Sequence, residues 1–387
     1  CTPWATDCRP GEFRLSANNR FQEVAKKISV VLLNGVLLVA MSACESINLG
    51  RDSMPTMVAV TIFTQEPRQT MEGFGASSRV WDDPHVSNAI STSVPAAAQE
   101  NVLTLLYTDL GLTRMRPVLD GGVEPINDNE DPAAFDWTKF HFEWKRTDAH
   151  ISLVEQARAK GLTTFFVSPV MLEAWMTENN PDEYVEWALA ILLRWRDRGV
   201  ELPYFSIINE PGYKRSGIWS AEWMRTVVKR LGARMRQEGF RTMLVIPDDL
   251  NPAEAYKRAS VVLRDSEARR YVGALAYHLY DTKVSELARD LAHMRNLAAE
   301  HGIPIWMTEF SVPNDITFSG AMEWMKIIHT LVATYNVSAV DYMWGFFGAW
   351  EKNHTILSIE FLDGQYVQHH VGPLYYLKGK FSKFVRP

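Results

Sequence analysis

Residues 205–211 read FSIINEP and residues 303–309 read IPIWMTE, and each segment joins an apolar run to a glutamate. Apolar runs of this length are typical of strands buried on both faces, as in a parallel sheet. A carboxylate at the end of such a strand is costly to bury unless it lines a cavity. Barrel enzymes carry their reactive groups at the C-terminal ends of their strands, so Glu210 and Glu309 are candidate catalytic residues.

Strand-like runs alternate with helical patterns from residue 71 onward, the helical ones covering 149–160, 183–196, 222–237 and 283–300. The expected strands are 71–75, 112–119, 163–168, 204–209, 242–247, 272–278, 303–309 and 339–344. Eight β/α units favour an α/β fold with one closed (β/α)8 TIM barrel. A doubly wound open sheet is the alternative, but residues 73–78 lack the third glycine of a phosphate-binding turn.

The composition excludes several classes of protein. With 47% hydrophobic residues, the 387-residue chain can form a large core. The formal charge is −6, and Lys and Arg are interspersed with acidic residues, so we expect no nucleic-acid partner. The chain has no Gly-x-Ser-x-Gly turn, which argues against a serine esterase. It has no His-Glu-x-x-His motif and its histidines are dispersed, so we expect neither a metal site nor a cofactor.

The first 44 residues contain all three cysteines, Cys1, Cys8 and Cys44. Residues 24–44 run from two lysines through the apolar stretch 28–40 to small residues, which is the order of an export signal. The apolar stretch is too short to span a membrane as a helix. Its ending at Cys44 resembles a bacterial lipoprotein signal, although a buried N-terminal helix is the alternative. We therefore expect export, acylation of Cys44, and attachment to a bacterial envelope or cell surface through the lipid alone.

The remaining domain boundaries follow from these segments. Residues 1–23 precede the signal and contain no methionine, so we expect a non-native or upstream leader. Residues 45–55 are expected to form a polar linker, and residues 56–387 the catalytic domain. A short alternating strand is expected at 58–63, as a remnant of a side β-domain.

The two glutamates suit the hydrolysis of a glycosidic bond with retention of configuration. This reaction needs one carboxylic acid to protonate the leaving oxygen and one carboxylate, about 5 Å away, to attack the anomeric carbon. We assign Glu210 as acid/base and Glu309 as nucleophile, because Asn209 can bind the sugar hydroxyl next to the reacting carbon. Either glutamate alone could instead be an ordinary carboxylate at a helix N-terminus.

Together these motifs resemble glycoside hydrolase family 30, one of the clan A retaining glycosidase families. The similarity covers nearly all of residues 56–387, and the matching segments are QTMEGFG at 69–75, SP at 168–169, AWM at 174–176, NEP at 209–211, AYHLY at 276–280, WMTE at 306–309 and FSKFVRP at 381–387. The resemblance implies a β-glycosidase that acts on polysaccharide or oligosaccharide, with β-1,4-xylan as the first expected substrate. β-1,6-Glucan, β-1,6-galactan and exo-acting glucosidase or fucosidase activities stay open.

The resemblance also implies roles for five further residues. Arg116 would keep the nucleophile ionised, since a nearby cation lowers a carboxylate pKa. Tyr280 would donate to the nucleophile, with His278 on the same face of its strand. Trp175 and Trp344 match tryptophans of sugar subsites. The alternatives are a structural salt bridge for Arg116, a backbone-bonded His278, and core positions for the two tryptophans.

Two features depart from the family pattern. Residues 170–173, VMLE, replace a stretch where the family usually has a tryptophan soon after Ser-Pro. Family members normally continue past the segment at 381–387 into a β-sandwich, so we expect a truncated gene and an unpaired edge at 58–63. A surface lipoprotein that binds carbohydrate without catalysis is therefore the alternative function.

Overall fold

The computed structural model describes residues 68–82, 94–127, 131, 142–213, 217–282, 284–311, 317–348 and 355–387. The chain divides into two compact units, 1–69 and 70–387, and the fold described below is that of the second. The expected leader, signal peptide, Cys44, linker and strand at 58–63 lie outside the described residues, so they stay predictions.

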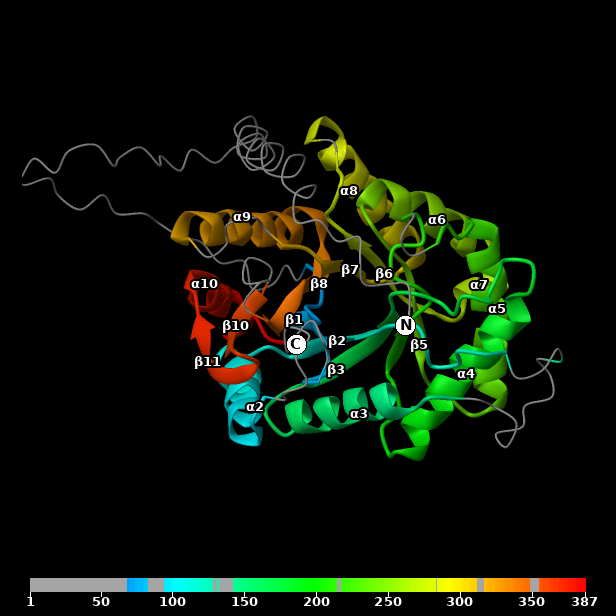
Figure 1. Ribbon diagram of the computed structural model, residues 1–387. Coiled ribbons are helices and arrows are strands. Elements are labelled where there is room, and N and C mark those ends of the chain that lie inside the picture. Colours follow the sequence, from blue (N-terminus) through cyan, green and yellow to red (C-terminus); the bar gives the residue numbers. More distant parts are fainter. Residues whose placement is uncertain are drawn as a thin grey trace, which may run out of the picture. The chain divides into compact units, whose positions relative to one another are not determined.

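Within the described ranges, eight parallel strands close into a barrel in sequence order, with β1 paired to β8 (Figure 1). The (β/α)8 barrel expected from the alternating pattern is thus confirmed. Every expected strand is present within a few residues, and β6 matches its expected range. The strands are β1 (Gly73–Ser78), β2 (Arg114–Leu119), β3 (Thr164–Pro169), β4 (Tyr204–Ser206), β5 (Met243–Asp249), β6 (Val272–His278), β7 (Ile305–Glu309) and β8 (Val337–Tyr342).

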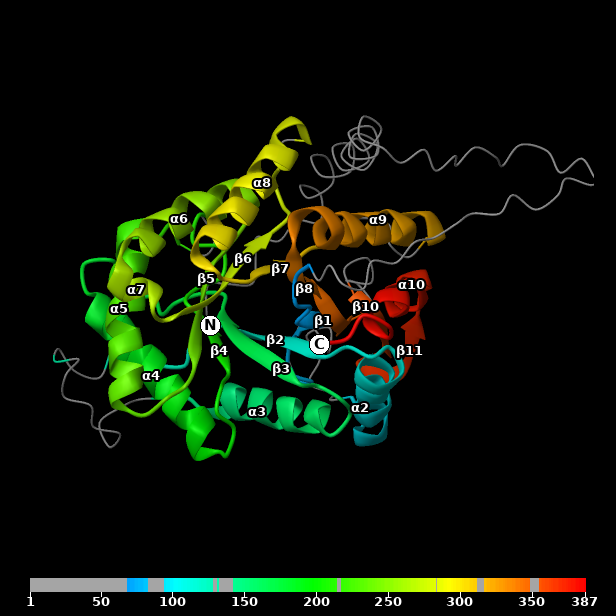
Figure 2. The same cartoon turned by 180° about the vertical axis from the view of Figure 1, so that it is seen from behind.

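Helices surround the barrel and cover the outer faces of its strands (Figure 2). The four helical patterns expected from the sequence correspond to α3, α4, α5 and α8. The helices are α2 (Ala96–Leu103), which continues as the π-helix η3 (Thr104–Asp109), α3 (Lys145–Arg158), α4 (Pro181–Asp197), α5 (Ala221–Gln237), α6 (Pro252–Arg264), α7 (Ser266–Arg269), α8 (Val284–His301), α9 (Phe318–Tyr335) and α10 (Pro373–Ser382). Side-chain caps fix the starts of α5 and α6, where Ser220 and Asn251 accept backbone N–H bonds.

The barrel interior combines apolar packing with one buried ion pair. Small and aromatic side chains of the strands form a common cluster around Trp306. Arg114 on β2 forms two 3.1 Å hydrogen bonds with Asp341 on β8, and its guanidinium lies 4.1 Å from the centroid of the Trp306 ring. A charge buried this deeply is tolerated because its partner is both charged and hydrogen-bonded.

A second, three-stranded sheet follows the barrel in the chain. Its strands are β9 (Trp344–Gly348), β10 (Thr355–Leu362) and β11 (Gln365–Val371), in the order β11-β10-β9. The last barrel strand was expected at 339–344, and its end was wrong, because β8 ends at Tyr342 and Trp344 begins β9. The sheet leads into α10. The Ser382 hydroxyl of this helix donates to the carbonyl of Leu110, which precedes β2 in the chain.

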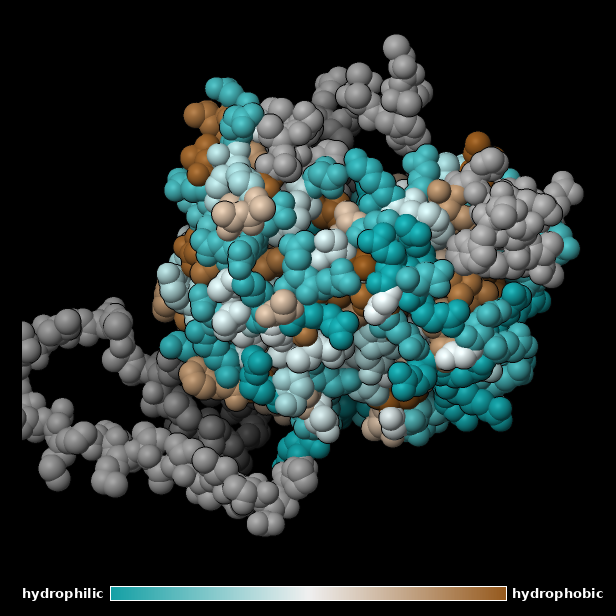
Figure 3. Space-filling view, turned by 90° about the horizontal axis from the view of Figure 1, so that it is seen from below, coloured by the Kyte–Doolittle hydropathy of each residue, from teal (hydrophilic) through white to brown (hydrophobic). Residues whose placement is uncertain are grey.

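The surface seen in Figure 3 is mainly hydrophilic, with apolar residues scattered among polar ones, as is normal for a folded domain. In the part of the chain that the structure describes, no helix is both long and apolar enough to cross a membrane.

Candidate active site

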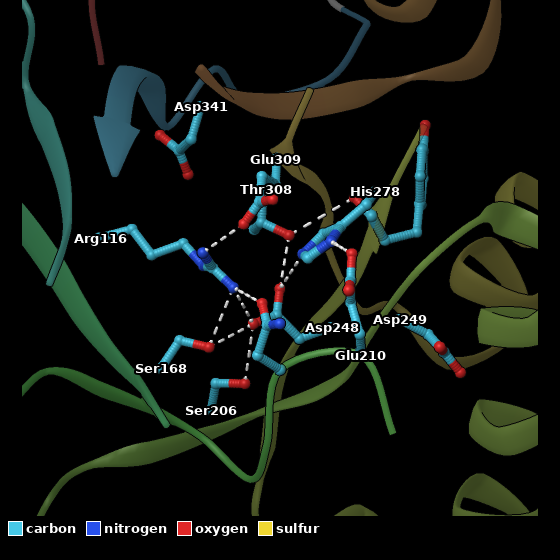
Figure 4. Close-up of polar contacts among 12 residues, drawn as sticks. Arg116, Ser168, Ser206, Glu210, Asp248, Asp249, His278, Thr308, Glu309 and Asp341 are labelled. Carbon is cyan, nitrogen blue, oxygen red and sulfur yellow. Dashed lines mark hydrogen bonds and ion pairs between the residues drawn. The ribbon is translucent and has the colours of Figure 1, made fainter. Parts of the chain in front are cut away.

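Glu210 and Glu309 are brought together at the C-terminal ends of β4 and β7 (Figure 4). One carboxylate oxygen of each, and one ring nitrogen of His278, lie within 4.8 Å of one another. The glutamate side chains keep 10% and 12% exposure, so both are largely shielded but reachable. Two carboxyl groups at this separation are able to act on the same glycosidic bond.

Glu210 does not belong to β4, which ends at Ser206 rather than at residue 209 as expected. Beyond Ser206 the chain leaves the ladder, and Glu210 has a left-handed φ of +48°. Its N–H donates to the carbonyl of Asp248 at 2.9 Å, and that of Asn209 donates to Pro169 at 2.7 Å. A left-handed non-glycine residue costs roughly 1–3 kcal/mol, so these bonds hold a conformation the chain would not adopt alone.

Arg116 on β2 is the central cation of the site. Its guanidinium donates to Glu309 Oε2 at 2.8 Å, to Asp248 Oδ2 at 3.0 Å, and to Asn209 Oδ1. Burial alone would lower the pKa of Arg116, but the charges of Asp248 and Glu309 raise it above its ordinary value. The residue is therefore a fixed positive charge that touches both the nucleophile candidate and the residue preceding the acid/base candidate.

Asp248 is a site residue that the sequence analysis missed. It lies near the end of β5, is fully buried, and accepts hydrogen bonds from the hydroxyls of Thr308 (2.6 Å), Ser168 (2.7 Å) and Ser206 (3.0 Å). Burial works to raise its pKa, but Arg116 and His278 hold the pKa well below the usual range. The missed signal was the segment VIPDD at 245–249, another apolar strand that ends in carboxylates. The expected strand stopped at residue 247 and so left out its two aspartates.

His278 connects the acid/base candidate to Asp248. Its Nδ1 lies 2.8 Å from Glu210 Oε1, and its Nε2 lies 3.3 Å from Asp248 Oδ1. Burial works to lower the pKa of His278, but Glu309 and the bonds to Asp248 and Glu210 raise it to about 10. At neutral pH both ring nitrogens therefore carry a proton and donate to Glu210 Oε1 and Asp248 Oδ1, so the partners of His278 are side chains rather than backbone.

Burial raises the pKa of Glu309, and the charges of Glu210 and Asp248 add to this effect, while His278 and Arg116 oppose it. The pKa of Glu309 is above its ordinary value as a result, so Arg116 limits the rise without reversing it. Tyr280 is half-buried, and its hydroxyl is enclosed near Glu309 and Ser311, without a hydrogen bond of good geometry. Burial and the two glutamates raise the pKa of Tyr280 well above 10, which keeps the phenol protonated as a donor.

The two tryptophans expected at sugar subsites make contacts with protein groups. The Trp175 indole donates to the carbonyl of Glu124 at 2.8 Å. The Trp344 ring is buried, lies 5.1 Å from the Arg79 guanidinium and stacks on Phe347 with centroids 4.8 Å apart. Among the described contacts, none joins either indole to the two glutamates, so their roles in sugar binding stay predictions.

The segment that departs from the family pattern has a structural role of its own. Glu173 is buried in the loop between β3 and α4, and its carboxylate accepts the backbone N–H groups of Gly122, Val123 and Glu124 at 2.8–3.0 Å. It therefore ties this loop to the one between β2 and α3. Nearby, Asp120 at the end of β2 pairs with Arg79 at 2.6 Å.

Glu210, His278 and Glu309 are the one group in the described ranges whose atoms are close enough to hold a metal ion. In this arrangement Glu309 is bonded to Arg116 and Glu210 to His278, and the three side chains are also able to transfer protons. The expectation of no metal and no cofactor stays a prediction.

Comparisons with known proteins agree with this fold. No family model matches the chain. A Caenorhabditis elegans protein named "Putative glucosylceramidase 2" is 25% identical over 268 residues, which are 60% of this chain and 50% of that protein. A second protein of that organism, "Putative glucosylceramidase 1", is 23% identical over 274 residues. The chain spans about half the length of these curated relatives.

Solved structures share the fold. A GH30 endoxylanase from Clostridium papyrosolvens has a TM-score of 0.60 at 23% identity, with 82% of this chain and 73% of that chain covered. The catalytic domain of a GH30 xylanase from Talaromyces cellulolyticus has a TM-score of 0.64 at 19% identity, with coverage of 82% and 77%. An endo-β1,6-glucanase has a TM-score of 0.66 at 17% identity, with coverage of 88% and 82%.

The fold and the site thus define a (β/α)8 barrel with a paired-glutamate centre at the ends of β4 and β7. The resemblance to glycoside hydrolase family 30 is confirmed, because the similar structures include xylanases of that family and the relatives carry the names of glycoside hydrolases.

Proposed function

We propose that this protein is a retaining β-glycoside hydrolase that acts on polysaccharide by double displacement. The observation that carries the proposal is the separation of Glu210 and Glu309, whose nearest oxygens lie within 4.8 Å. Retaining enzymes hold their carboxyl groups about 5 Å apart, whereas inverting enzymes leave about 6.5–9.5 Å for a water molecule.

In the first step Glu309 attacks the anomeric carbon while the bond to the leaving oxygen breaks. Glu210 gives its proton to that oxygen, which departs as an alcohol. In the second step Glu210 takes a proton from a water molecule, whose oxygen displaces Glu309 from the sugar. His278, 2.8 Å from Glu210, orients the carboxyl through both steps, and the cation of Arg116 stabilises Glu309 when it is released.

Asn209 has a defined part in this scheme. Its Oδ1 accepts from Arg116, so the amide orientation is fixed and the Nδ2 hydrogens are the donors it can offer to a sugar hydroxyl. Hydrogen bonds to the hydroxyl next to the reacting carbon strengthen in the transition state of this reaction.

The first proposed substrate is β-1,4-xylan, supported by the sequence WMTE at residues 306–309 and by the likeness to GH30 xylanases. β-1,6-Glucan is the second, supported by the likeness to an endo-β1,6-glucanase. The names of the curated relatives favour an exo-acting glucosidase as the third. Product analysis after incubation with xylan, β-1,6-glucan, β-1,6-galactan and 4-nitrophenyl glucoside or fucoside separates these activities.

Azide rescue tests the mechanism. Glu309→Ala and Glu210→Ala should each lose most activity, and azide should restore turnover of an activated aryl glycoside. We expect an α-glycosyl azide from Glu309→Ala and a β-glycosyl azide from Glu210→Ala, because azide replaces a different group in each. Identical products from both variants would contradict the assignment, and a wild-type protein that binds sugar without cutting it would establish the non-catalytic alternative.

We also propose export and acylation at Cys44, supported by the order of charged, apolar and small residues in 24–44. In a bacterial host, labelled palmitate should enter the wild-type protein and not the Cys44→Ser variant. Equal labelling of the two, or labelling of neither, would contradict lipidation at this residue.

A further inference from the structure

A second buried ion pair lies beside the segment that carries Glu210. Asp249, the last residue of β5, is fully buried, and its Oδ2 lies 2.6 Å from Nη1 of Arg258 on α6. In Figure 4 the Asp249 side chain points away from the cluster around Arg116, whereas that of the preceding Asp248 points into it. The strand is irregular here, because Asp248 has a left-handed φ of +58° and the pairing with β6 shifts between Pro247 and Asp249, and the two aspartates serve different parts of the site.

The pair is bonded to the backbone on both sides of the turn after Glu210. Asp249 Oδ1 accepts from the Gly212 N–H at 3.3 Å, and Arg258 Nε donates to the Trp219 carbonyl at 3.2 Å. The Trp219 N–H in turn donates to the Pro211 carbonyl at 2.9 Å. Through these bonds the ion pair fixes the chain within two residues of the acid/base glutamate.

The ion pair leaves little room for a side chain at Gly212. A Cβ at this position would lie 3.0 Å from Nη1 of Arg258 and 3.2 Å from Oδ1 of Asp249. Any larger residue would therefore require the ion pair to shift by a few tenths of an ångström.

Glu210 has particular need of such support. Its backbone is left-handed, and its carboxyl must reach the leaving oxygen in one step and a water molecule in the next. His278 holds only the carboxyl end of the side chain, and the Asp248 carbonyl holds only the N–H. A misplacement of a reacting group by about 1 Å can cost about a hundredfold in rate, so the remaining backbone contacts matter.

We propose that Asp249 and Arg258 are positioning residues for the acid/base step: they fix the backbone of residues 210–212 and thereby the reach of the Glu210 carboxyl. This inference rests on the proposed retaining mechanism. Loss of the pair should weaken proton donation by Glu210 more than attack by Glu309, because Glu309 is held by Arg116 from a separate strand.

The test compares Arg258→Met with wild type on aryl β-glycosides of the sugar that the wild type accepts. A 2,4-dinitrophenyl group leaves without a proton, whereas a phenyl group needs one. Loss of positioning should lower kcat/KM about tenfold more for the phenyl glycoside than for the dinitrophenyl one. Arg258→Lys should recover part of this loss, and the double variant Asp249→Asn/Arg258→Met avoids an unpaired buried carboxylate if the single variant folds poorly.

The matched control is Glu254→Gln. Glu254 Oε2 lies 3.3 Å from the same guanidinium but makes no described bond to the turn after Glu210, so this variant should keep the wild-type leaving-group dependence. An equal loss of kcat/KM on both substrates in Arg258→Met would mean a general structural role and would overturn the inference.

A second readout does not depend on activity. Hydrogen exchange of the peptide covering residues 207–213 should be faster in Arg258→Met than in wild type and Glu254→Gln, while the peptide covering β7 stays unchanged. Unchanged exchange at 207–213 would also overturn the inference. If the wild type cuts no glycoside, the proposed function fails, and exchange still decides whether the pair holds this segment.

Discussion

His278 lies 2.8 Å from Glu210, so the group expected to deliver the proton is in direct contact with a buried imidazolium. The second nitrogen of the ring is near Asp248, which carries no proton because the pKa of its carboxyl is held low. One cationic ring thus bonds to the side chains of both Glu210 and Asp248 and fixes the orientation of the Glu210 carboxyl.

Replacing Asp248 by Asn should be strongly destabilising. The change leaves the buried cations Arg116 and His278 without their shared carboxylate, at a cost of about 3–5 kcal/mol. The free energy of unfolding from urea titration, followed by tryptophan fluorescence, measures this cost. Ser206→Ala removes only one neutral donor to the same carboxylate and should cost about 1 kcal/mol; equal losses in the two variants would contradict the central place of Asp248.

Stability should depend on the protonation of His278. Its pKa is raised from 6.5 to about 10 on folding, so the folded state binds the proton more tightly. The stabilisation is fully present below pH 6.5 and is lost as the pH rises through about 10. We expect the stability advantage of wild type over His278→Gln to shrink across this range in urea titrations. The exposed His329 is a control site, where substitution should change the free energy of unfolding little.

The ion pair inside the barrel should behave differently when one or both partners are removed. Arg114→Met leaves Asp341 buried without a cation and should lower the free energy of unfolding by about 3–5 kcal/mol. The double variant Arg114→Met/Asp341→Leu removes both charges and should recover most of this loss. Thermal or urea denaturation of the two variants checks the difference; a double variant as unstable as the single one would refute it.

Glu173→Gln should loosen the loop between β2 and α3. The charged carboxylate accepts three backbone N–H groups, and a neutral amide accepts them more weakly, so we expect a loss of about 1–3 kcal/mol. Because the loop lies outside the Arg116 cluster, KM for polysaccharide should rise while kcat on a small aryl glycoside changes little. Glu155→Gln, at an exposed position of α3, should alter neither quantity.

Much of this architecture could be predicted from sequence because its signals are local. Apolar runs ending in carboxylates marked the strand ends that carry Glu210 and Glu309. Asp248 was missed because Pro247 was taken as the end of its strand. The sheet β9–β11 was missed because Trp344 follows β8 after one residue and reads as its continuation. The contacts of Trp344 with Arg79 and Phe347 depend on the folded arrangement, which no local pattern records.

Arg116 bonds to groups from several strands of the barrel, including Ser77 on β1, Ser168 on β3 and Asp248 on β5. It also bonds to Asn209 and Glu309. One guanidinium therefore couples the geometry of almost the whole rim, and a change at any of these positions reaches both glutamates. The loops tied by Glu173 lie outside this coupling. Substitutions in those loops can therefore alter substrate recognition without disturbing the two glutamates. A substitution in the reacting centre instead affects all the residues that Arg116 connects.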